Sequence, residues 1–514
     1  MKRSPNILLV MADQLPASAL AAYGNTQVDA PNLARLAAGG TVFESAYCMS
    51  PLCAPSRFSM LAGRLPSRIG AWDNAAELPS ATPTLIHSFR AAGYRTALSG
   101  KMHFVGPDQL HGFEERLTTD VYPSNYDWTP DWRLGAGERA SWYHNMSSVT
   151  GAGIREVAEQ TDFDDEACYR AVQWLRHYSM AAAEPFLLTV SFTNPHDPWD
   201  VRSEYWDRYR TDELDLPLVP QIDPGDADPH SLRLREMFGA DAERLTDQQI
   251  RRARHGYYGA VSYLDARVGE VLDALDRNGL ADDTIVVFTA DHGEMLGEHG
   301  LWYKMTFLDG GARVPLLIRR PGADPGRVPG PVSHLDLAPT LLELAGVDPG
   351  EARFDGTSLL PSLDGSGPTP EVVRGEYFAE GVCSPMVMLR ERSLKYIRCE
   401  GDPDQLFDLE ADPLELVNLA GDPRHADTLD RLRSATERDW DLPSLKARVL
   451  ESQRERRVVA AALRAGLYTP WDHQPFVDAS MQYVRPPAAD RGRPGGRYVF
   501  GGPLTNPLVD PVAG

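Results

Sequence analysis

Asn6-Ile7-Leu8-Leu9-Val10-Met11 stands near the start of the chain, and from Ile7 onward it is an unbroken apolar run. A strand with one face in water would alternate apolar and polar side chains, and this run does not. It therefore predicts a central strand of a parallel sheet that is covered on both faces. The run leads directly into two polar side chains, Asp13 and Gln14.

Three later runs, at residues 94–99, 186–192 and 284–289, follow the same design. Each follows a helix-like segment and is itself followed by polar or ionisable side chains, namely Lys101 and His103, Asn194 and His196, and Asp291 and His292. In an open parallel sheet the carboxyl ends of the strands share one edge, where ligands bind. A capping or surface role is the alternative for any one cluster, but four of them predict a shared site.

A chain of 514 residues is too long for one simple core. We predict an α/β fold, with a large domain built on a mostly parallel central sheet flanked by helices and a smaller C-terminal α+β domain. Residues 386–389 and 394–398 predict antiparallel strands of that smaller domain. The Gly- and Pro-rich stretch 363–370 predicts a boundary, giving domains 1–365 and 366–468 and a tail, 469–514.

The tail carries aromatic side chains in a segment that cannot fold alone. It is predicted to pack over its own domain or a neighbouring subunit, which favours a homo-oligomer, either a dimer or a tetramer. Asp490 is the tail acid predicted to reach the pocket.

The formal net charge of −22 argues against nucleic acid and against an anionic membrane surface as partners. The five cysteines are scattered and odd in number, which is not a disulfide framework. The first residues lack the features of a secretory signal, and no stretch is long enough to span a bilayer. We therefore expect a cytoplasmic protein in which Cys53 is made as a free thiol.

Cys53-Ala54-Pro55-Ser56-Arg57 precedes a helical run that ends at Gly63. A thiol at the start of this helix, beside Arg57, would lie near backbone amides that favour an anion. A buried cysteine next to a surface arginine is the simpler alternative, and these five residues do not decide between the two.

The residue types at the strand ends suit a metal and an oxyanion. Asp13, Asp291 and His292, with the Gln14 amide, offer mostly oxygen ligands and one imidazole, which suits Ca²⁺, Mg²⁺ or Mn²⁺ and leans slightly toward Mn²⁺. Fixed positive charge and proton-transfer groups are added by Arg57, Lys101, Lys304, His103 and His196. Together these groups predict a site for a tetrahedral oxyanion, either sulfate or phosphate.

The stretch 53–57, continued by Leu61-Ala62-Gly63-Arg64, resembles the signature of type I sulfatases of the alkaline-phosphatase-like superfamily. The resemblance extends to residues 100–103, 289–294, 299–304 and 313–315. More narrowly, residues 63–70, 73–77, 101–113 and 471–476 are similar to those of choline-sulfatases. Ala62 stands where the signature usually has Thr. Gln14 and His292 stand where most arylsulfatases have Asp and Asn, which points to the choline-sulfatase and phosphonate monoester hydrolase side.

The resemblance implies that a formylglycine-generating enzyme oxidises Cys53 to formylglycine, whose hydrated aldehyde attacks sulfur and then expels sulfate. It implies a metal held by Asp13, Gln14, Cys53, Asp291 and His292. It further implies that Arg57 steadies the nucleophile, that Lys101 and Lys304 hold sulfate oxygens, that His103 is the base for breakdown of the sulfated intermediate, and that His196 assists the leaving oxygen.

The substrate that the resemblance implies is choline-O-sulfate, hydrolysed to choline and sulfate. A quaternary ammonium needs an aromatic face and carboxylates, and the matched positions are Asn74, Trp128, His144 and Glu380, with Glu376 as a neighbouring option. This substrate is a zwitterion, so the net charge of −22 need not repel it. The alternatives are a phosphonate or phosphate ester hydrolase, a sulfatase for another small ester, or a non-catalytic binder of choline esters.

Overall fold

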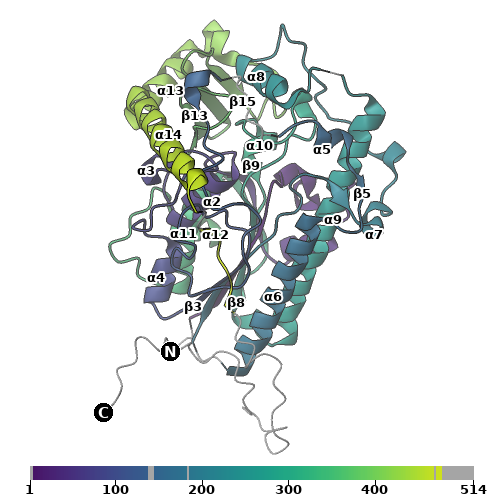
Figure 1. Cartoon of the computed structure of the whole chain (residues 1–514), viewed down its shortest axis with the longest axis vertical. Helices are drawn as coiled ribbons and strands as arrows, with labels where there is room; N and C mark the ends of the chain where they lie inside the picture. The colour runs from purple at the N-terminus through teal and green to yellow at the C-terminus, as the bar shows by residue number, and fades with distance from the viewer. Residues whose placement is uncertain (1–3, 137–143, 182–183, 243, 468–469, 477–514) are drawn as a thin grey trace, which may run out of the picture.

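The structure is a computed structural model that describes residues 4–136, 144–181, 184–242, 244–467 and 470–476 (Figure 1). Its strands are β1 (Asn6–Ala12), β2 (Thr41–Tyr47), β3 (Arg95–Gly100), β4 (Glu115–Arg116), β5 (Gly153–Ile154), β6 (Phe186–Ser191), β7 (Asp200–Val201), β8 (Thr284–Ala290), β9 (Arg313–Val314), β10 (Leu316–Arg319), β11 (Gly326–Ser333), β12 (Val372–Tyr377), β13 (Met386–Glu391), β14 (Leu394–Cys399) and β15 (Gln405–Asp408). Its helices are α1 (Pro31–Ala38), α2 (Cys53–Ala62), α3 (Pro66–Ile69), α4 (Leu85–Ala91), α5 (Ser147–Thr150), α6 (Glu159–Ala181), α7 (Ser203–Trp206), α8 (Pro229–Phe238), α9 (Asp247–Arg277), α10 (Asp309–Ala312), α11 (Leu337–Ala345), α12 (Leu360–Leu363), α13 (Ala426–Asp439) and α14 (Leu442–Ala465).

The large sheet has nine strands within the described residues, in the order β11-β2-β10-β8-β1-β6-β3-β4, with β9 paired to β2. The first apolar run forms β1, which lies between β6 and β8 and runs parallel to both. The later runs form β3, β6 and β8, as predicted. Strands β9 and β10 are antiparallel to their neighbours, so the sheet is mostly parallel, and the predicted fold class is confirmed.

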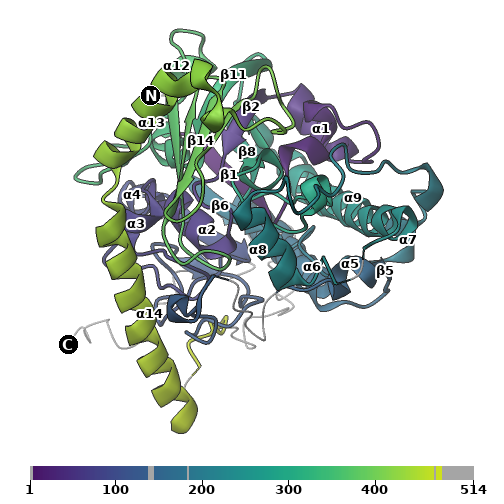
Figure 2. The same ribbon diagram turned by 90° about the horizontal axis from the view of Figure 1, so that it is seen from above.

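Helices cover both faces of this sheet, which explains why β1 is apolar on both sides. The long helices α6 and α9 lie against one face, and α2 and α4 lie against the other (Figures 1 and 2). Every residue of β1, β6 and β8 is buried. The longest helix, α9, begins at a capping box in which Thr246 and Gln249 each bond the other's backbone N–H.

The second sheet is antiparallel, in the order β12-β13-β14-β15. It contains both predicted C-terminal strands, now seen as β13 and β14. Buried side chains of the two sheets, such as Val287 and Met388, belong to one continuous hydrophobic cluster. The stretch predicted as a domain boundary lies between α12 and β12, and the division at residue 365 stays a prediction.

After α13 the chain continues into α14, a helix of 24 residues that the sequence analysis did not predict. Beyond it, the ring of Trp471 lies 5.3 Å from that of Tyr126, and the Nε2 atom of His473 lies 3.2 Å from the carbonyl oxygen of Arg116. Residues 477–514, with Asp490, lie outside the described residues, so docking of the tail on a neighbouring subunit stays a prediction. Among the described helices, none is long and apolar enough to cross a membrane.

Candidate active site

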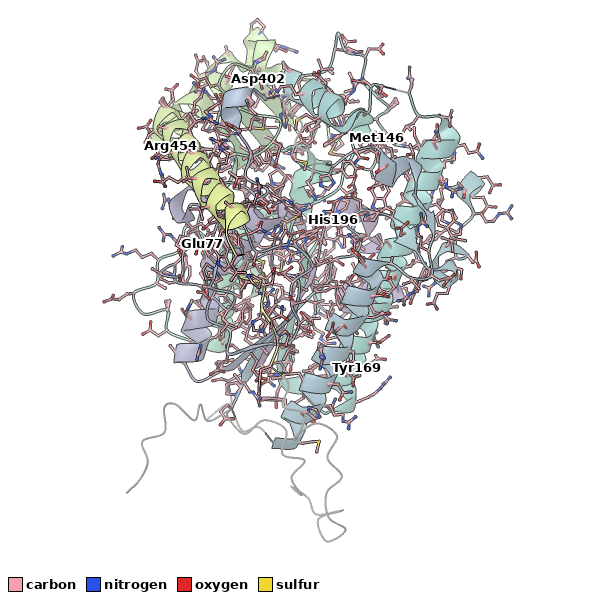
Figure 3. All side chains as sticks on the ribbon, viewed as in Figure 1. Glu77, Met146, Tyr169, His196, Asp402 and Arg454 are labelled. Carbon is pink, nitrogen blue, oxygen red and sulfur yellow. The ribbon has the colours of Figure 1, made fainter. Side chains whose placement is uncertain are left out.

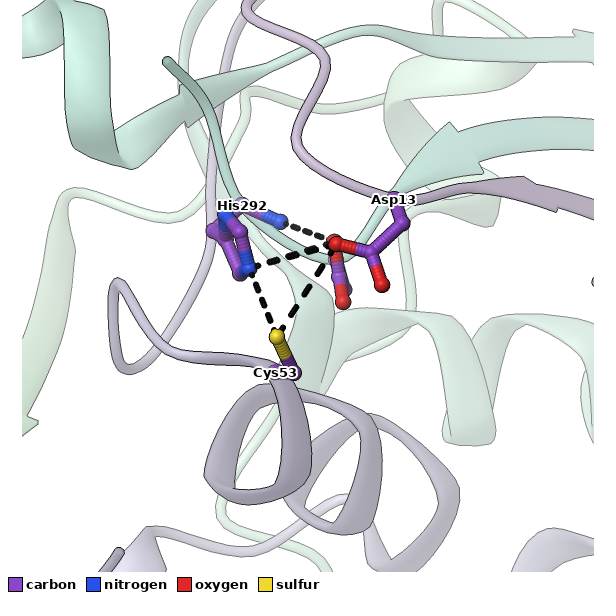
Figure 4. A group of neighbouring side chains, drawn as sticks. Asp13, Cys53 and His292 are labelled. Carbon is purple, nitrogen blue, oxygen red and sulfur yellow. Dashed lines mark hydrogen bonds and ion pairs between the residues drawn. The ribbon is translucent and has the colours of Figure 1, made fainter. Parts of the chain in front are cut away.

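The ends of β1 and β8 bring the predicted metal ligands together. Ala12 pairs with Ala290 across the two parallel strands, so the residues that follow, Asp13 and Asp291, emerge at the same level. Cys53 is the first residue of α2. Ligand atoms of Asp13, Cys53, Asp291 and His292 all lie within 4.8 Å of one another, and all four residues are buried (Figure 4). We call these four residues the cation cluster.

The donor atoms of the cation cluster fit a metal ion. The Nδ1 atom of His292 lies 3.0 Å from the carbonyl oxygen of Gly293, which can only accept, so Nδ1 carries the proton and Nε2 carries the lone pair. That lone pair lies 3.6 Å from a carboxylate oxygen of Asp13 and 3.6 Å from one of Asp291. Burial lowers the pKa of His292, which keeps the ring neutral. Electron pairs of buried atoms that face one another in this way suit a bound cation.

Two cations support the carboxylates of the cluster. The Arg57 guanidinium donates to Asp291 at 2.8 Å and to Asp13 at 3.2 Å, and Lys101 pairs with Asp13. Burial opposes ionisation of Asp13, yet the surrounding cationic groups, led by Lys101, hold its pKa well below its usual value. Asp13 therefore carries its negative charge throughout the physiological pH range.

Gln14 is held in one orientation beside the cluster. Its Nε2 atom donates to Glu294 at 2.6 Å, which leaves its Oε1 atom to accept from the Lys304 ammonium at 2.5 Å. Its backbone lies in the left-handed region, with φ of 63°, and its N–H donates to Asp291 at 3.0 Å. The predicted ligand therefore presents its carbonyl oxygen on the side of Lys304.

Lys304 and His196 form a proton-sharing pair. The Lys304 ammonium donates to the Nε2 atom of His196 at 2.7 Å, and the Nδ1 atom of His196 lies 2.7 Å from the carbonyl oxygen of Asp197. Burial and the charge of Lys304 hold the pKa of His196 well below its usual value. Burial opposes the charge on Lys304, but the neighbouring anionic groups raise its pKa. The proton of the pair therefore resides on Lys304.

His103 differs from His196 because its polar neighbour is the Cys53 thiol, and among the described residues no oxygen or nitrogen atom bonds its ring nitrogens. Its backbone N–H donates to the Asp120 carboxylate at 2.8 Å, which fixes the turn after β3. Burial lowers the pKa of His103. A neutral imidazole has a lone pair on one ring nitrogen and can accept a proton there, as the predicted role of general base requires.

A cavity of about 530 Å³ opens beside the cation cluster. Seven of the predicted site residues line it, namely Cys53, Asn74, Trp128, His144, His196, Lys304 and Glu380. His196 lies near the middle of the molecule (Figure 3). Arg57, Lys101 and His103 are buried. The structure therefore brings the predicted catalytic and substrate-binding residues to one place, although they come from distant parts of the chain.

The lining of the cavity also combines aromatic and acidic groups. The Trp128 ring lies 5.1 Å from that of Tyr122, and the His144 ring stacks on Tyr303 at 4.4 Å. One carboxylate oxygen of Glu380 is buried with no hydrogen-bond partner among the described residues, and burial raises the pKa of this carboxyl to about 8. We call the four lining residues predicted to bind the substrate, Asn74, Trp128, His144 and Glu380, the far wall, although Asn74 lies next to the start of α2.

Glu376, the other carboxylate predicted as a possible contact for the choline group, already has hydrogen-bond partners outside the cavity. Its carboxylate accepts from the backbone N–H and hydroxyl of Ser67 at 2.7 and 2.8 Å, and from the Trp440 indole at 2.6 Å. It does not line the cavity. Glu380 is therefore the better of the two candidates.

The sequence analysis missed three side chains of the site. Tyr122 places its ring 4.0 Å from the Lys101 ammonium, Glu294 orients Gln14, and Asp197 lies 3.3 Å from His144. Glu294 stands at the end of the stretch 289–294 and Asp197 directly follows His196, both of which the sequence analysis had singled out. Their partners are distant in sequence, so spacing gave no signal for them.

The family model for sulfatases matches residues 5–347, a further one for the C-terminal region of the choline sulfatase enzyme matches residues 447–488, and one for the C-terminal region of N-sulphoglucosamine sulphohydrolase matches residues 297–439. The chain belongs to the sulfatase family. It is a sulfuric ester hydrolase.

Among its relatives, the choline-sulfatase of Rhizobium meliloti (strain 1021) is 50% identical over 493 residues, which are 94% of this chain and 96% of the relative. Arylsulfatase K of Gallus gallus is 30% identical over 457 residues, 83% of this chain and 81% of the relative. A solved phosphonate monoester hydrolase from Silicibacter pomeroyi is 26% identical, with a TM-score of 0.69, and the match covers 85% of this chain and 95% of that one.

Proposed function

We propose that the protein hydrolyses choline-O-sulfate to choline and sulfate. The observation that carries this proposal is the far wall, which places an aromatic ring and the buried Glu380 carboxyl, one oxygen of which has no partner among the described residues, in the same cavity as Lys304 and Cys53. A quaternary ammonium has no N–H to donate and is bound by aromatic faces and negative charge. The identity to a choline-sulfatase over nearly the whole chain supports the same substrate.

The proposal includes two groups that complete the site. Formylglycine, made from Cys53 by a formylglycine-generating enzyme, would supply a hydrated aldehyde as nucleophile. A divalent metal, Ca²⁺ or Mn²⁺ with Mg²⁺ also suitable, would be held by Asp13, Asp291 and His292, with Gln14 beside them, and would supply Lewis acidity. A cytoplasmic location and a dimeric or tetrameric assembly belong to the same proposal.

The side chains of the protein have separate tasks around the sulfate group. Lys101 and Lys304 would hold its oxygens, since Lys101 pairs with Asp13 of the cation cluster and Lys304 bonds Gln14 and lines the cavity. The Lys304–His196 pair carries a proton on the cavity side and would deliver it to the leaving alkoxide. His103, a neutral imidazole beside Cys53, would take the proton whose loss allows sulfate to leave. Arg57 would hold the two carboxylates in place.

A phosphonate monoester hydrolase is the second candidate, because solved enzymes of that kind share this fold over most of both chains. The discriminating experiment compares kcat/KM for choline-O-sulfate, an aryl sulfate and a phosphonate monoester. We expect choline-O-sulfate to be preferred by at least about a hundredfold, as expected when a site is built around one headgroup. Negligible turnover of choline-O-sulfate would reject the proposal, and preference for the phosphonate would establish the second candidate. Binding of choline esters without turnover of any substrate would instead favour the non-catalytic binder.

A further inference from the structure

Helix α14 buries two polar side chains on the face that packs against the rest of the protein. Its buried residues are Leu445, Val449, Gln453, Arg456 and Ala460, which share one face of the helix. Apolar residues would be expected at all five positions of such a stripe. Gln453 and Arg456 break the pattern, and both contact loops that build the far wall.

Arg456 forms a buried, two-pronged ion pair with Asp73. The two guanidinium nitrogens donate to the two carboxylate oxygens at 2.6 and 2.7 Å. Arg456 is 7% exposed and Asp73 is fully buried. A buried ion pair contributes little net stability because both charges lose their water, so geometric specificity is the better explanation of its presence.

The residue after Asp73 acts on the helix that carries the nucleophile. Helix α2 begins after Leu52, whose side chain cannot cap it. The Ala54 N–H, which has no partner inside the helix, donates instead to the Oδ1 atom of Asn74 at 3.0 Å. Asn74 therefore holds the first turn of α2, with Cys53 in it, and also lines the cavity.

The Arg456 guanidinium also lies close to the loop that carries Trp128, a second segment of the far wall. It lies 3.4 Å from the hydroxyl of Thr129, the residue after Trp128. On the same face of α14, one turn earlier, Gln453 accepts from the backbone N–H of Trp132 at 3.0 Å. The indole of Trp132 in turn donates to the carbonyl oxygen of Ala379, next to Glu380. One face of α14 thus contacts the loop that carries Asn74 and the loop that carries Trp128. Through Trp132 it is also linked to the segment that carries Glu380.

We propose that Arg456 is a positioning residue for the reaction, whose ion pair with Asp73 holds Asn74 against the first turn of α2 and keeps Cys53 aligned with the far wall. This inference rests on the proposed function for its kinetic test. It does not depend on which ester is hydrolysed, because the contacts concern the nucleophile as well as the substrate pocket. Arg456 does not line the cavity, and it acts through Asp73 and Asn74.

The test removes the pair without leaving a buried charge. In the double variant Asp73→Asn/Arg456→Met both charges are lost, while the amide introduced at position 73 retains an oxygen for the Ala75 N–H, which now donates to Asp73 at 2.9 Å. Arg456→Lys keeps the positive charge but loses the two-pronged geometry. Arg454→Met is the matched control, since Arg454 lies on the same helix, is half exposed and pairs with Glu451 (Figure 3).

Three kinds of measurement are made on the full-length proteins. The kinetic constants kcat and KM are determined for choline-O-sulfate and corrected for the formylglycine fraction, which intact mass gives. Hydrogen exchange is followed at the Ala54 amide, and the midpoint of thermal unfolding reports whether each variant is folded. We expect the double variant to lose about tenfold to a hundredfold in kcat/KM, as small misplacements of reacting groups do. Its Ala54 amide should exchange faster, because the Asn74 contact is loosened. Arg456→Lys should fall between wild type and the double variant, and Arg454→Met should match wild type.

Unchanged kinetics and unchanged Ala54 exchange in the double variant would overturn the proposal. Loss of the folded state in that variant would also overturn it, because the pair would then serve stability alone. If the wild-type enzyme hydrolyses another ester instead, the proposed function fails, whereas Ala54 exchange still tests the positioning role.

Discussion

The cation cluster, which reaches the cavity through Cys53, and the far wall, which lines it, are built in different ways. Asp13 and Asp291 leave adjacent parallel strands at the same level, and Arg57 contacts both carboxylates. The far wall comes instead from loops around residues 74, 128, 144 and 380, which no single sheet aligns. One side is positioned by strand pairing, and the other by side chains that reach across the chain.

This difference in construction assigns the chemical step to the cation cluster and the choice of substrate to the far wall. Strand ends on a buried sheet suit groups whose mutual distances must be fixed, such as metal ligands, and the start of α2 adds Cys53 to them. Loops can change their side chains without disturbing the sheet, so they suit the recognition of one headgroup. Variants of the cluster should therefore abolish turnover of every substrate, whereas variants of the far wall should change the preference among substrates.

The largest effect is expected from Cys53→Ala. This variant removes the precursor of the nucleophile, so kcat should fall by roughly four orders of magnitude or more for every ester. The alanine side chain fits the buried position, and choline should still bind with wild-type affinity, as measured by calorimetry. Turnover that persists in Cys53→Ala would show that the reaction does not use this residue.

The next largest effect is expected from removal of the metal. Exhaustive chelation should lower activity by about a thousandfold or more, and added Ca²⁺ or Mn²⁺ should restore it. Because buried carboxylate and imidazole electron pairs face one another in the cluster, metal-free protein should also unfold at lower temperature and regain its midpoint with metal. Metal content is measured in parallel. Full activity in protein shown to contain less than about a tenth of an equivalent of metal would contradict the assigned site.

Much of the cluster could be predicted from the sequence because its residues follow local patterns. A continuous apolar run predicts each of β1, β6 and β8, and the polar residues that follow these parallel strands meet at one edge of the sheet. Strands β2, β10 and β11 were not predicted. Strand β11 carries Gly330 and Pro331 and is exposed over part of its length, so its pattern is weak.

The far wall could be predicted only through resemblance, and what supports it could not be predicted. Helix α14 was not predicted because Gln453 and Arg456 stand among the apolar residues of its buried face. They interrupt the apolar periodicity by which a helix is recognised in a sequence. Likewise, Tyr122 covers Lys101 through a contact between segments that pack only in the folded protein. Buried polar contacts between distant segments leave no periodic signal in the sequence.

A moderate effect is expected from Trp128→Ala. Loss of an aromatic face opposite a quaternary ammonium costs about 1 to 2 kcal/mol in a desolvated site, so KM for choline-O-sulfate should rise about tenfold with a smaller change in kcat. Trp128→Phe should give an intermediate KM. An aryl sulfate, which lacks the cation, serves as the control and should be affected less. Equal changes for both substrates would mean that Trp128 does not recognise the headgroup.

The smallest effect is a pH dependence of substrate preference, which we expect from ionisation of Glu380 in the far wall. Burial raises the pKa of Glu380 to about 8, so the carboxyl is mostly neutral at pH 7 and becomes a carboxylate as the pH rises through 8. The charged form attracts a quaternary ammonium and the neutral form does not. The ratio of kcat/KM for choline-O-sulfate to that for an aryl sulfate should therefore rise about threefold between pH 7 and pH 9, because kcat/KM reports ionisations of the free enzyme.

Taking this ratio cancels ionisations of the shared catalytic groups, such as His103 and the Lys304–His196 pair, which act on both substrates. Glu380→Gln is the matched variant, since it keeps the size of the side chain and cannot ionise. Its ratio should stay flat at the level that wild type shows near pH 7. A wild-type ratio that is also flat, or a rise that persists in Glu380→Gln, would remove Glu380 from headgroup recognition and leave that task to the aromatic part of the far wall.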